Sequence, residues 1–253
     1  MTEILVPRRF CGPPSSGNGG WSAGALAAAT VERTDHAEPW PAITVALRMP
    51  PPLDVEMPVA EEDGWTLASY DGKPVARARV ADHELAAVPA VSVAEAHAAT
   101  PGYRGHLAHP FPTCFTCGPG RDEGDGLRIF PGPVASDAEP RVAAPWTPHP
   151  SVAEDWHAYH DDARHASLPV TWAALDCVGG WSTDIDERPM VLGTITLRAD
   201  TLPVIGEEHV VVGAVRGAEG RKTFTSATLY DSAGRLVATA EHIWITVDPA
   251  DFG

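Results

Sequence analysis

The chain has 253 residues and a formal net charge of −16, and no basic stretch offsets that charge. This balance argues against nucleic acid or an anionic membrane as a partner, although an anionic small ligand needs only a few local cations. The hydrophobic fraction of 44% is enough for a sizeable core, and the length suits one large domain or two of ordinary size.

Targeting and redox signals are weak along the chain. Residues 1–20 lack a charged segment followed by an apolar run, so we expect no signal peptide. No apolar run reaches the ~18 residues needed to cross a bilayer. Four cysteines in a chain of this length do not indicate a disulfide framework. We therefore expect a cytoplasmic protein.

The first part of the chain predicts one helix followed by strands. A Gly/Pro/Ser-rich segment comes first, with a short strand expected at 8–11, and a helix of small residues follows at 19–31. Alternation and β-branched residues then predict strands at 42–49, 54–59, 64–70 and 74–82. The Ala/Pro-rich stretch 84–112 connects the halves and contains a short helix, Ser92 to Ala99, with Ser92 as its N-cap.

The second part, from about Cys114 onward, repeats this order. Strands are expected at 127–130 and 140–144, and a helix at 169–181. An insertion at 145–168, rich in Trp, His and Asp, precedes the helix. Four more strands are expected at 190–199, 208–216, 221–231 and 235–247. One helix and a run of antiparallel strands, twice, is an α+β pattern, in which the strands join edge to edge or pack as a pair and the helices are neighbours.

The two halves also share sequence. The strand 43–48 resembles 194–198, and the Tyr-Asp turn at 70–76 resembles the turn at 230–238. Aligning Arg48 with Arg198 gives an offset of 150 residues. Near this offset the helix starts differ, since the first has Asn18-Gly19-Gly20 and the second has Ser167-Leu168-Pro169.

An acidic residue also distinguishes the two helices. Asp176 lies in the second helix where the first has Ala27. Each half therefore carries one feature that the other lacks, which predicts a single composite site. The equivalent second site would have no acid, and Pro169 lacks an N–H, so we expect it to be inactive.

Two local motifs add to this pattern. Phe10-Cys11-Gly12-Pro13 precedes Asn18-Gly19-Gly20-Trp21, and Cys114-Phe115-Thr116-Cys117-Gly118-Pro119 precedes Gly126-Leu127-Arg128-Ile129. The first resembles the segment where a Gly-Gly pair starts the helix of a hotdog unit. The second resembles the N-terminal segment of phenylacetyl-CoA-thioesterase-like proteins. With the duplicated order, the whole chain resembles the double hotdog fold of acyl-CoA thioesterases.

The resemblance implies two fused hotdog units, each with a central helix wrapped by an antiparallel sheet. The units are 1–83 and 113–253, joined by the connector 84–112, and the second unit carries the insertion 145–168. In these relatives His-Gly-Gly opens the helix, and an acid about two turns along a helix works against the helix start of the partner unit. Here the glycines are in the first half, without the His, and the acid is in the second. The family also contains dehydratases and non-catalytic members, so the fold does not fix the activity.

The helix start at Asn18-Gly19-Gly20 can stabilise an oxyanion. Backbone N–H groups at a helix N-terminus are unpaired, and the helix dipole adds positive potential. Glycine lets a thioester carbonyl approach this backbone closely. We expect the amides of Gly19 and Gly20 to polarise the carbonyl, and the structural alternative is a tight turn with Asn18 as N-cap.

Asp176 can supply or activate the nucleophile. It lies in an otherwise apolar helix, where a carboxylate costs free energy unless it is paired or faces a cleft. Apolar surroundings raise the pKa of a carboxyl group, as suits a general base. The structural alternative is an Asp on the surface of an amphipathic helix, or one that caps a neighbouring loop.

Other residues supply weaker candidates. We expect Trp21, Trp172, Arg128 and Arg198 to contact the substrate, and the cations available for CoA phosphates are Arg121, Arg128, Arg198 and Lys222. The ligand types of zinc occur at His106, His109, Cys114 and Cys117. The Cys-x2-Cys belongs to the family-like segment and Pro110 and Pro112 restrict the loop, so we expect part-buried thiols and no metal.

The insertion is a further candidate region. Its histidines and acids could bind a metal or act in catalysis, but a lid with apolar side chains is the interpretation that we favour. The histidines and acids are His149, His157, His160, His165, Asp155, Asp161 and Asp162, and the aromatic residues are Trp146, Trp156 and Tyr159.

The function hypothesis from these observations is an acyl-CoA thioesterase-like hydrolase with a small-molecule acyl thioester as substrate. It needs no cofactor, because CoA is part of the substrate, and the chain is expected to be a monomeric pseudo-dimer or a homodimer. The alternative is a non-catalytic protein that binds acyl chains or other hydrophobic ligands on the same fold. A hydratase or dehydratase is disfavoured because neither helix contains a His.

Overall fold

The computed structural model describes residues 2–31, 40–135, 140–154 and 163–248. The helices are α1 (Gly19–Val31), α2 (Val93–Ala99) and α3 (Leu168–Trp181). The strands are β1 (Thr2–Leu5), β2 (Ile43–Leu47), β3 (Glu56–Glu62), β4 (Trp65–Tyr70), β5 (Lys73–Val80), β6 (Gly132–Pro133), β7 (Arg141–Trp146), β8 (Ala153–Glu154), β9 (His165–Ala166), β10 (Met190–Ala199), β11 (His209–Glu219), β12 (Lys222–Asp231) and β13 (Leu236–Thr246). None of the described helices is long and apolar enough to cross a membrane.

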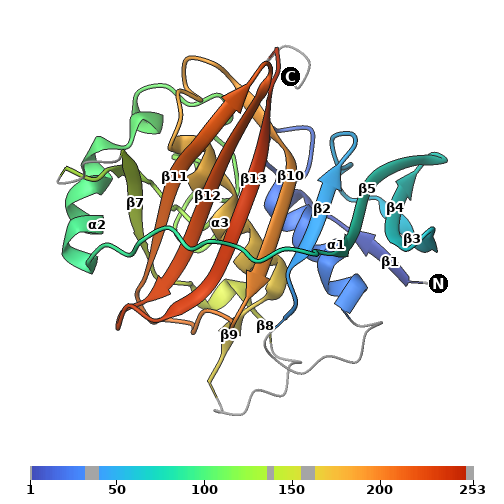
Figure 1. The fold of residues 1–253 in the computed structure, drawn as a ribbon, viewed down its shortest axis with the longest axis horizontal. Helices are drawn as coiled ribbons and strands as arrows, with labels where there is room; N and C mark the ends of the chain where they lie inside the picture. The colour runs from blue at the N-terminus through green and yellow to red at the C-terminus, as the bar shows by residue number, and fades with distance from the viewer. Residues whose placement is uncertain (1, 32–39, 136–139, 155–162, 249–253) are drawn as a thin grey trace.

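One antiparallel sheet organises the molecule (Figure 1). Its strand order is β1-β3-β4-β5-β2-β10-β13-β12-β11-β7-β6, so the strands of the first half lie together at one end. The small pair β8-β9 stands apart. The predicted edge-to-edge joining of the two sets of strands is confirmed, because β2 pairs directly with β10.

The join between β2 and β10 lies on a pseudo-two-fold axis. Val45 stands opposite Ile195, and these positions are equivalent at the repeat offset of 150 residues. One step away, the hydroxyl groups of Thr44 and Thr196 hydrogen-bond at 2.9 Å across the join. Because repeat-equivalent residues face each other here, the two halves are related like the subunits of a dimer.

The two long helices cover the same face of the sheet and pack against each other (Figure 1). Their contact depends on glycine. A Cβ on Gly20 would lie 2.8 Å from the carbonyl oxygen of Trp172, and one on Gly24 would lie 2.7 Å from the Cα of Pro169. Such contacts are shorter than side chains tolerate, so glycine lets the backbone of α1 approach α3 closely. The predicted helices are confirmed, with α3 beginning one residue earlier than expected.

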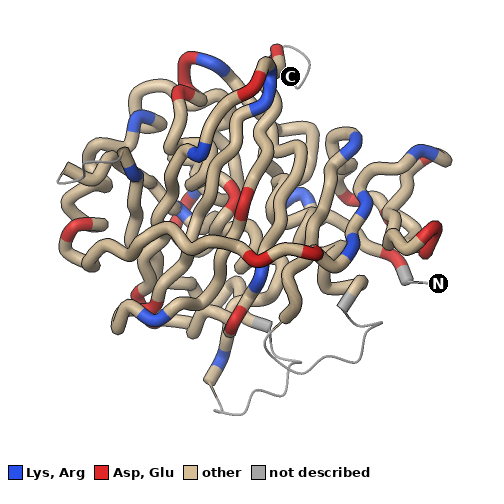
Figure 2. The backbone as a smooth tube through the Cα atoms, in the orientation of Figure 1, with Lys and Arg blue, Asp and Glu red and all other residues tan. Residues whose placement is uncertain are grey.

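The connector runs across the other face of the sheet toward α2 (Figure 1). It is anchored there by Val88, whose N–H donates to Thr228 Oγ1 and whose carbonyl accepts from Tyr230. The predicted N-cap Ser92 of α2 is confirmed, with Glu95 completing a capping box. Figure 2 shows positive and negative residues interspersed over the described chain, in agreement with the absence of a basic stretch in the sequence.

Two predicted strands are wrong. The strand expected at 8–11 is absent, because residues 8–10 form a 3-10 helix, and the edge strand of this region is β1 at Thr2–Leu5. The backbone turns after the 3-10 helix, and the carbonyl of Phe10 accepts a hydrogen bond from Asn18 N–H. Residues 127–130 are a loop, because Arg128 has a φ of 54°, which an extended strand excludes. The N–H groups of Leu127 and Ile129 donate instead to the carbonyls of Phe115 and Thr116. These bonds hold the loop that contains Cys114 and Cys117.

The close helix contact makes Gly24 sensitive to substitution. We expect Gly24→Ala to lower the free energy of unfolding by about 1–3 kcal/mol, because its Cβ meets backbone of α3 that cannot move alone. Gly180→Ala is the matched control, since its Cβ would meet only the side-chain ends of Ile185 and Trp244. Chemical denaturation measures both. Equal stability of the two variants would contradict the proposed role of the helix contact.

A buried histidine under α3 links stability to pH. His242 on β13 is 2% exposed and lies 3.1 Å from Thr225 Oγ1 through Nδ1. Burial disfavours the charged ring and lowers the pKa of His242 to about 4. The unfolded chain binds this proton near pH 6.5, so the stability from this residue is fully present above that pH and is lost as the pH falls toward 4.

We therefore expect His242→Gln to remove one component of the acid sensitivity. Lowering the pH from 7 to 4 destabilises the wild type by about 3 kcal/mol more than the variant, as the pKa difference requires. Urea denaturation at a series of pH values measures this difference. The exposed His97→Gln is the control and should keep the wild-type dependence. A parallel pH dependence of His242→Gln and wild type would contradict the assignment.

Candidate active site

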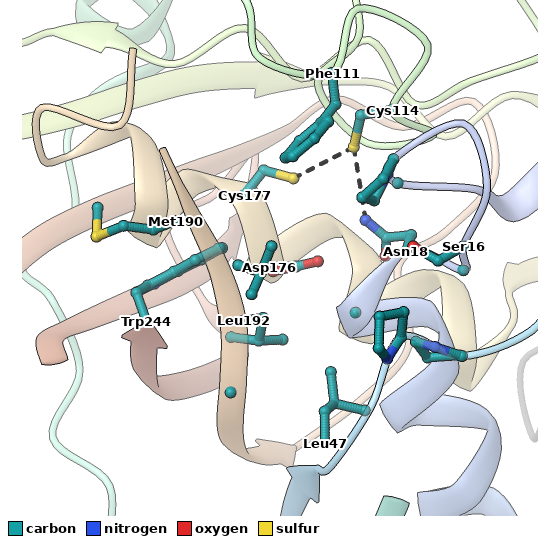
Figure 3. Close-up of a pocket in the computed structure, with 18 of the residues that line it drawn as sticks. Ser16, Asn18, Leu47, Phe111, Cys114, Asp176, Cys177, Met190, Leu192 and Trp244 are labelled. Atoms are coloured by element: carbon teal, nitrogen blue, oxygen red, sulfur yellow. Dashed lines mark hydrogen bonds between the residues drawn. The ribbon is translucent and has the colours of Figure 1, made fainter. Parts of the chain in front are cut away.

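A cavity of about 270 Å³ opens where the start of α1, the middle of α3 and the first residues of β10 meet. Figure 3 shows two parts of its wall. Asn18, Cys114, Asp176 and Cys177 lie together on the polar side. The apolar side is made by Leu47, Met190, Leu192 and Trp244. The site is therefore an apolar pocket with a small group of converging polar residues, the usual form of a small-molecule site.

Asp176 is the only carboxylate that the described part of the cavity wall contains. Its side chain is 2% exposed, and Oδ2 accepts a hydrogen bond of 2.8 Å from Gly20 N–H. Oδ1 has no partner among the described residues. Burial raises the pKa of Asp176 to about 7, while the hydrogen bond from Gly20 and the polar side chain of Asn18 act in the opposite direction. A buried carboxylate with one free oxygen at a cavity is placed to accept a proton or to attack.

The start of α1 supplies the hydrogen-bond donors. Asn18 is the N-cap, because its Oδ1 accepts from Trp21 N–H at 2.8 Å. Its Nδ2 lies 3.4 Å from Thr116 Oγ1. Gly19 lines the cavity as the first residue of the helix, whereas the buried Gly20 does not line it. Gly19 and Gly20, which were expected to act together on the carbonyl, therefore have different surroundings.

The structure brings Gly20 and Asp176 together, from different halves, as the sequence predicts. The N–H of Gly20 already donates to the carboxylate, so in this structure it is not free for a carbonyl oxygen. Among the described residues, Gly19 N–H makes no hydrogen bond. The helix start thus offers Gly19 to a ligand and uses Gly20 to hold Asp176.

The four residues expected to contact substrate do not line this cavity. Trp21 stacks on Phe10, with the ring centroids 4.4 Å apart, and Trp172 is buried in the contact of α3 with α1. Arg128 donates to the carbonyl of Arg121, beside a second cavity at His149. Arg198 pairs with Asp200 at 3.2 Å.

The cation that the structure places on the cavity wall is the exposed Arg48, at the end of β2. Sequence reasoning missed it, although its repeat partner Arg198 was considered. Of the other expected cations, Arg121 is committed to Asp125 at 2.8 Å and Lys222 is exposed on β12. Neither lines the cavity.

The pseudo-equivalent position has a different structure. Ser167 caps α3 through its side chain, which accepts from Val170 N–H, and Pro169 follows in the first turn. Ala27, at the position equivalent to Asp176, is fully buried. At this end of the helix pair, α1 therefore places no carboxylate opposite Ser167 and Pro169.

The remaining candidate residues are divided between several places. The ring of His106 meets those of Tyr103 and Phe130 edge to face, while His109 lies 3.4 Å from Cys117 Sγ through Nε2. Cys177, which sequence reasoning did not single out, joins Cys114 and Cys117. Its position next to Asp176 was the available signal.

The insertion is described only in part. His165 is buried and lies 2.9 Å from the carbonyl of Leu202, His149 accepts from Ser151 N–H, and Trp146 is buried on β7. The other candidates of this segment lie outside the described residues: Asp155, Trp156, His157, Tyr159, His160, Asp161 and Asp162.

The chain is similar to known proteins in its three-dimensional structure. No protein-family model matches the sequence, and a search of curated proteins gives no significant match. A proposed thioesterase from Novosphingobium aromaticivorans superposes with a TM-score of 0.65 at 13% identity, over 97% of this chain and 95% of the other. Acyl-CoA thioesterase II TesB2 from Mycobacterium marinum gives 0.56 at 14%, over 99% and 94%.

A conserved protein with a hot dog fold, from Alicyclobacillus acidocaldarius, superposes with a TM-score of 0.58 at 12% identity, over 98% of this chain and 93% of the other. The chain has the double hotdog fold. In this double hotdog the candidate site lies where the helix start of one repeat meets the middle of the helix of the other. At this level of identity the superpositions establish the fold, and the chemistry has to be argued from the residues.

Proposed function

We propose that this double hotdog protein is an acyl-CoA thioesterase-like hydrolase, with Asp176 as general base or nucleophile. One observation carries the proposal. Asp176 from the second repeat is held by Gly20 N–H at the helix start of the first, and its free Oδ1 belongs to a side chain that lines the cavity. The full-length likeness to a protein named as an acyl-CoA thioesterase supports the choice of reaction.

The proposed reaction uses both helices. Gly19 N–H, assisted by the positive end of α1, binds the thioester carbonyl oxygen and stabilises the negative charge that develops on it. Asp176 either takes a proton from a water molecule that attacks the carbonyl carbon, or attacks that carbon itself to form an anhydride that water opens. In the first route Asp176 passes the proton that it took from water to the leaving sulfur as the carbon–sulfur bond breaks. In the second route the sulfur leaves as a thiolate that takes a proton from solvent, and water then opens the anhydride to give the acid and regenerate the carboxylate.

The substrate class follows from the lining of the cavity. Leu47, Met190, Leu192 and Trp244 offer an apolar surface that suits an acyl group. Arg48 is the exposed cation beside this surface and the candidate contact for the phosphates of CoA. This arrangement replaces the contacts expected from Arg128 and Arg198.

Asp176→Asn tests the proposed function. The amide cannot take a proton or attack, so we expect CoA release to fall by roughly 10²–10⁴-fold while the fold is retained. Release should be followed by chromatography over acyl-CoAs of graded chain length, because the four thiols of the protein would react in a colorimetric thiol assay.

Asp200→Asn is the control for this variant. Asp200 pairs with Arg198 away from the cavity, so its amide should keep wild-type turnover. Turnover that is equal in Asp176→Asn and wild type would remove Asp176 from the mechanism. Saturable binding of acyl-CoA without turnover by the wild type would favour the non-catalytic binding protein instead.

A matched pair of variants at Gly19 tests the role of its amide. Pro is accepted at the first position of a helix and removes only the N–H, whereas Ala keeps it. Both add a Cβ that meets Leu192 at 3.0 Å. We expect kcat of Gly19→Pro to lie about 10²–10³-fold below that of Gly19→Ala, the usual cost of losing an oxyanion donor. Equal kcat at equal thermal stability would show that this N–H does not act on the carbonyl.

A further inference from the structure

Three cysteines from two distant segments meet at the cavity wall. Cys114 and Cys117 belong to the loop before β6, and Cys177 follows Asp176 on α3. Their sulfur atoms all lie within 4.8 Å of one another, and those of Cys114 and Cys177 are 3.6 Å apart (Figure 3). A tetrahedral zinc with Zn–S bonds of about 2.3 Å holds its sulfur ligands about 3.8 Å apart, so this spacing suits a metal.

The loop has the local shape of a thiolate ligand turn. Gly118 N–H donates to the carbonyl of Cys114 at 2.9 Å, which closes a tight turn over the two cysteines. A Cβ on Gly118 would lie 2.5 Å from that carbonyl, so the turn requires glycine. The tight turn brings the Cys114 and Cys117 sulfurs together on one side of the loop, as a Cys-x2-Cys metal site needs.

The surroundings of the sulfurs are rich in donors. Asn18 Nδ2 lies 3.7 Å from Cys114 Sγ, and His109 Nε2 lies 3.4 Å from Cys117 Sγ. His109 Nδ1 accepts from Phe111 N–H, so in the neutral ring the proton is on Nε2, which is directed at Cys117 Sγ. Hydrogen-bond donors stabilise negatively charged sulfur. On the described cavity wall, the exposed Arg48 is the one Lys or Arg that could balance this negative charge.

We propose that Cys114, Cys117 and Cys177 form a three-thiolate site for a thiophilic divalent cation, with zinc as the best fit. His109 is an outer-shell residue that donates to the Cys117 sulfur rather than a ligand. Because the three cysteines line the cavity, the fourth position of the ion is open to water or to a ligand in the cavity. The site would fasten the 109–118 loop to α3. This proposal departs from the expectation of part-buried thiols without a metal, and its ligand set differs from the four residues His106, His109, Cys114 and Cys117 found by sequence spacing.

The fourth cysteine provides a matched control. Cys11 is buried like the others, but its sulfur accepts from Arg121 Nη2 at 3.0 Å and lies outside the cluster. Serine at this position should leave metal binding unchanged, whereas serine at Cys177 removes a ligand.

The experiment measures metal in the full chain, produced without a histidine tag and kept reduced without chelator. We expect elemental analysis to find about one zinc ion per chain in the wild type and in Cys11→Ser. Zinc should be lost from Cys114→Ser, Cys117→Ser and Cys177→Ser. Cobalt added to the stripped wild type should give sulfur-to-cobalt charge-transfer bands, and these bands should be absent in Cys177→Ser. His109→Ala should bind about 10- to 100-fold more weakly, the usual loss for an outer-shell partner.

Several results would overturn the site. They are a wild type that takes up neither zinc nor cobalt, equal metal content in Cys177→Ser and Cys11→Ser, or a mass loss of two hydrogens that shows a disulfide in place of the metal. Circular dichroism identifies a variant that fails to fold. In that case the cobalt spectrum of the wild type still shows whether sulfur atoms bind the metal. The inference is independent of the proposed hydrolysis, because Asp176→Asn should lose turnover and keep the metal.

Discussion

The close contact between α1 and α3 is the constraint on which the rest of the structure depends. Gly20 and Gly24 remove the side chains that would separate the helices, and the backbone of α1 comes near enough for Gly20 N–H to reach Asp176. A hydrogen bond to a charged group contributes about 1.5–3 kcal/mol, which offsets part of the cost of burying the carboxylate. Packing and site chemistry therefore rest on the same two helix faces.

Duplication explains why, among the described residues, one of the two equivalent helix positions pairs a carboxylate with a helix start and the other does not. The pseudo-two-fold axis at Val45 and Ile195 gives the molecule two helix starts and two helix middles. Ala27 fills the core at one of these positions, and Asp176 occupies the other beside the cavity. A second buried carboxylate at position 27 would carry the same desolvation cost without a free helix start opposite, because Pro169 has no N–H to donate. One half thus supplies the donors and the other supplies the acid.

The polar wall of the cavity gathers one carboxylic acid and three thiols beside apolar surface. Asp176 and the three cysteine sulfurs line a space that is otherwise made largely by apolar side chains. Polar groups of Asn18, Gly20 and His109 surround these groups. A bound cation at the sulfurs would complete this balance of charge, and it would lie next to the residue that we assign to the chemistry.

The resemblance to hotdog proteins implied that Asp176 would face the glycines. The sequence alone determined the repeat, the two long helices and ten-residue strands such as β10. These follow from periodicity and from a repeat that local residues record directly. It did not show that residues 127–130 are a loop, that Gly20 is committed to Asp176, or that Cys177 and Arg48 reach the cavity. Those facts depend on contacts between segments far apart in the chain. The direction of a side chain across a helix contact is set by the packing of both partners, and only the tertiary structure contains that information.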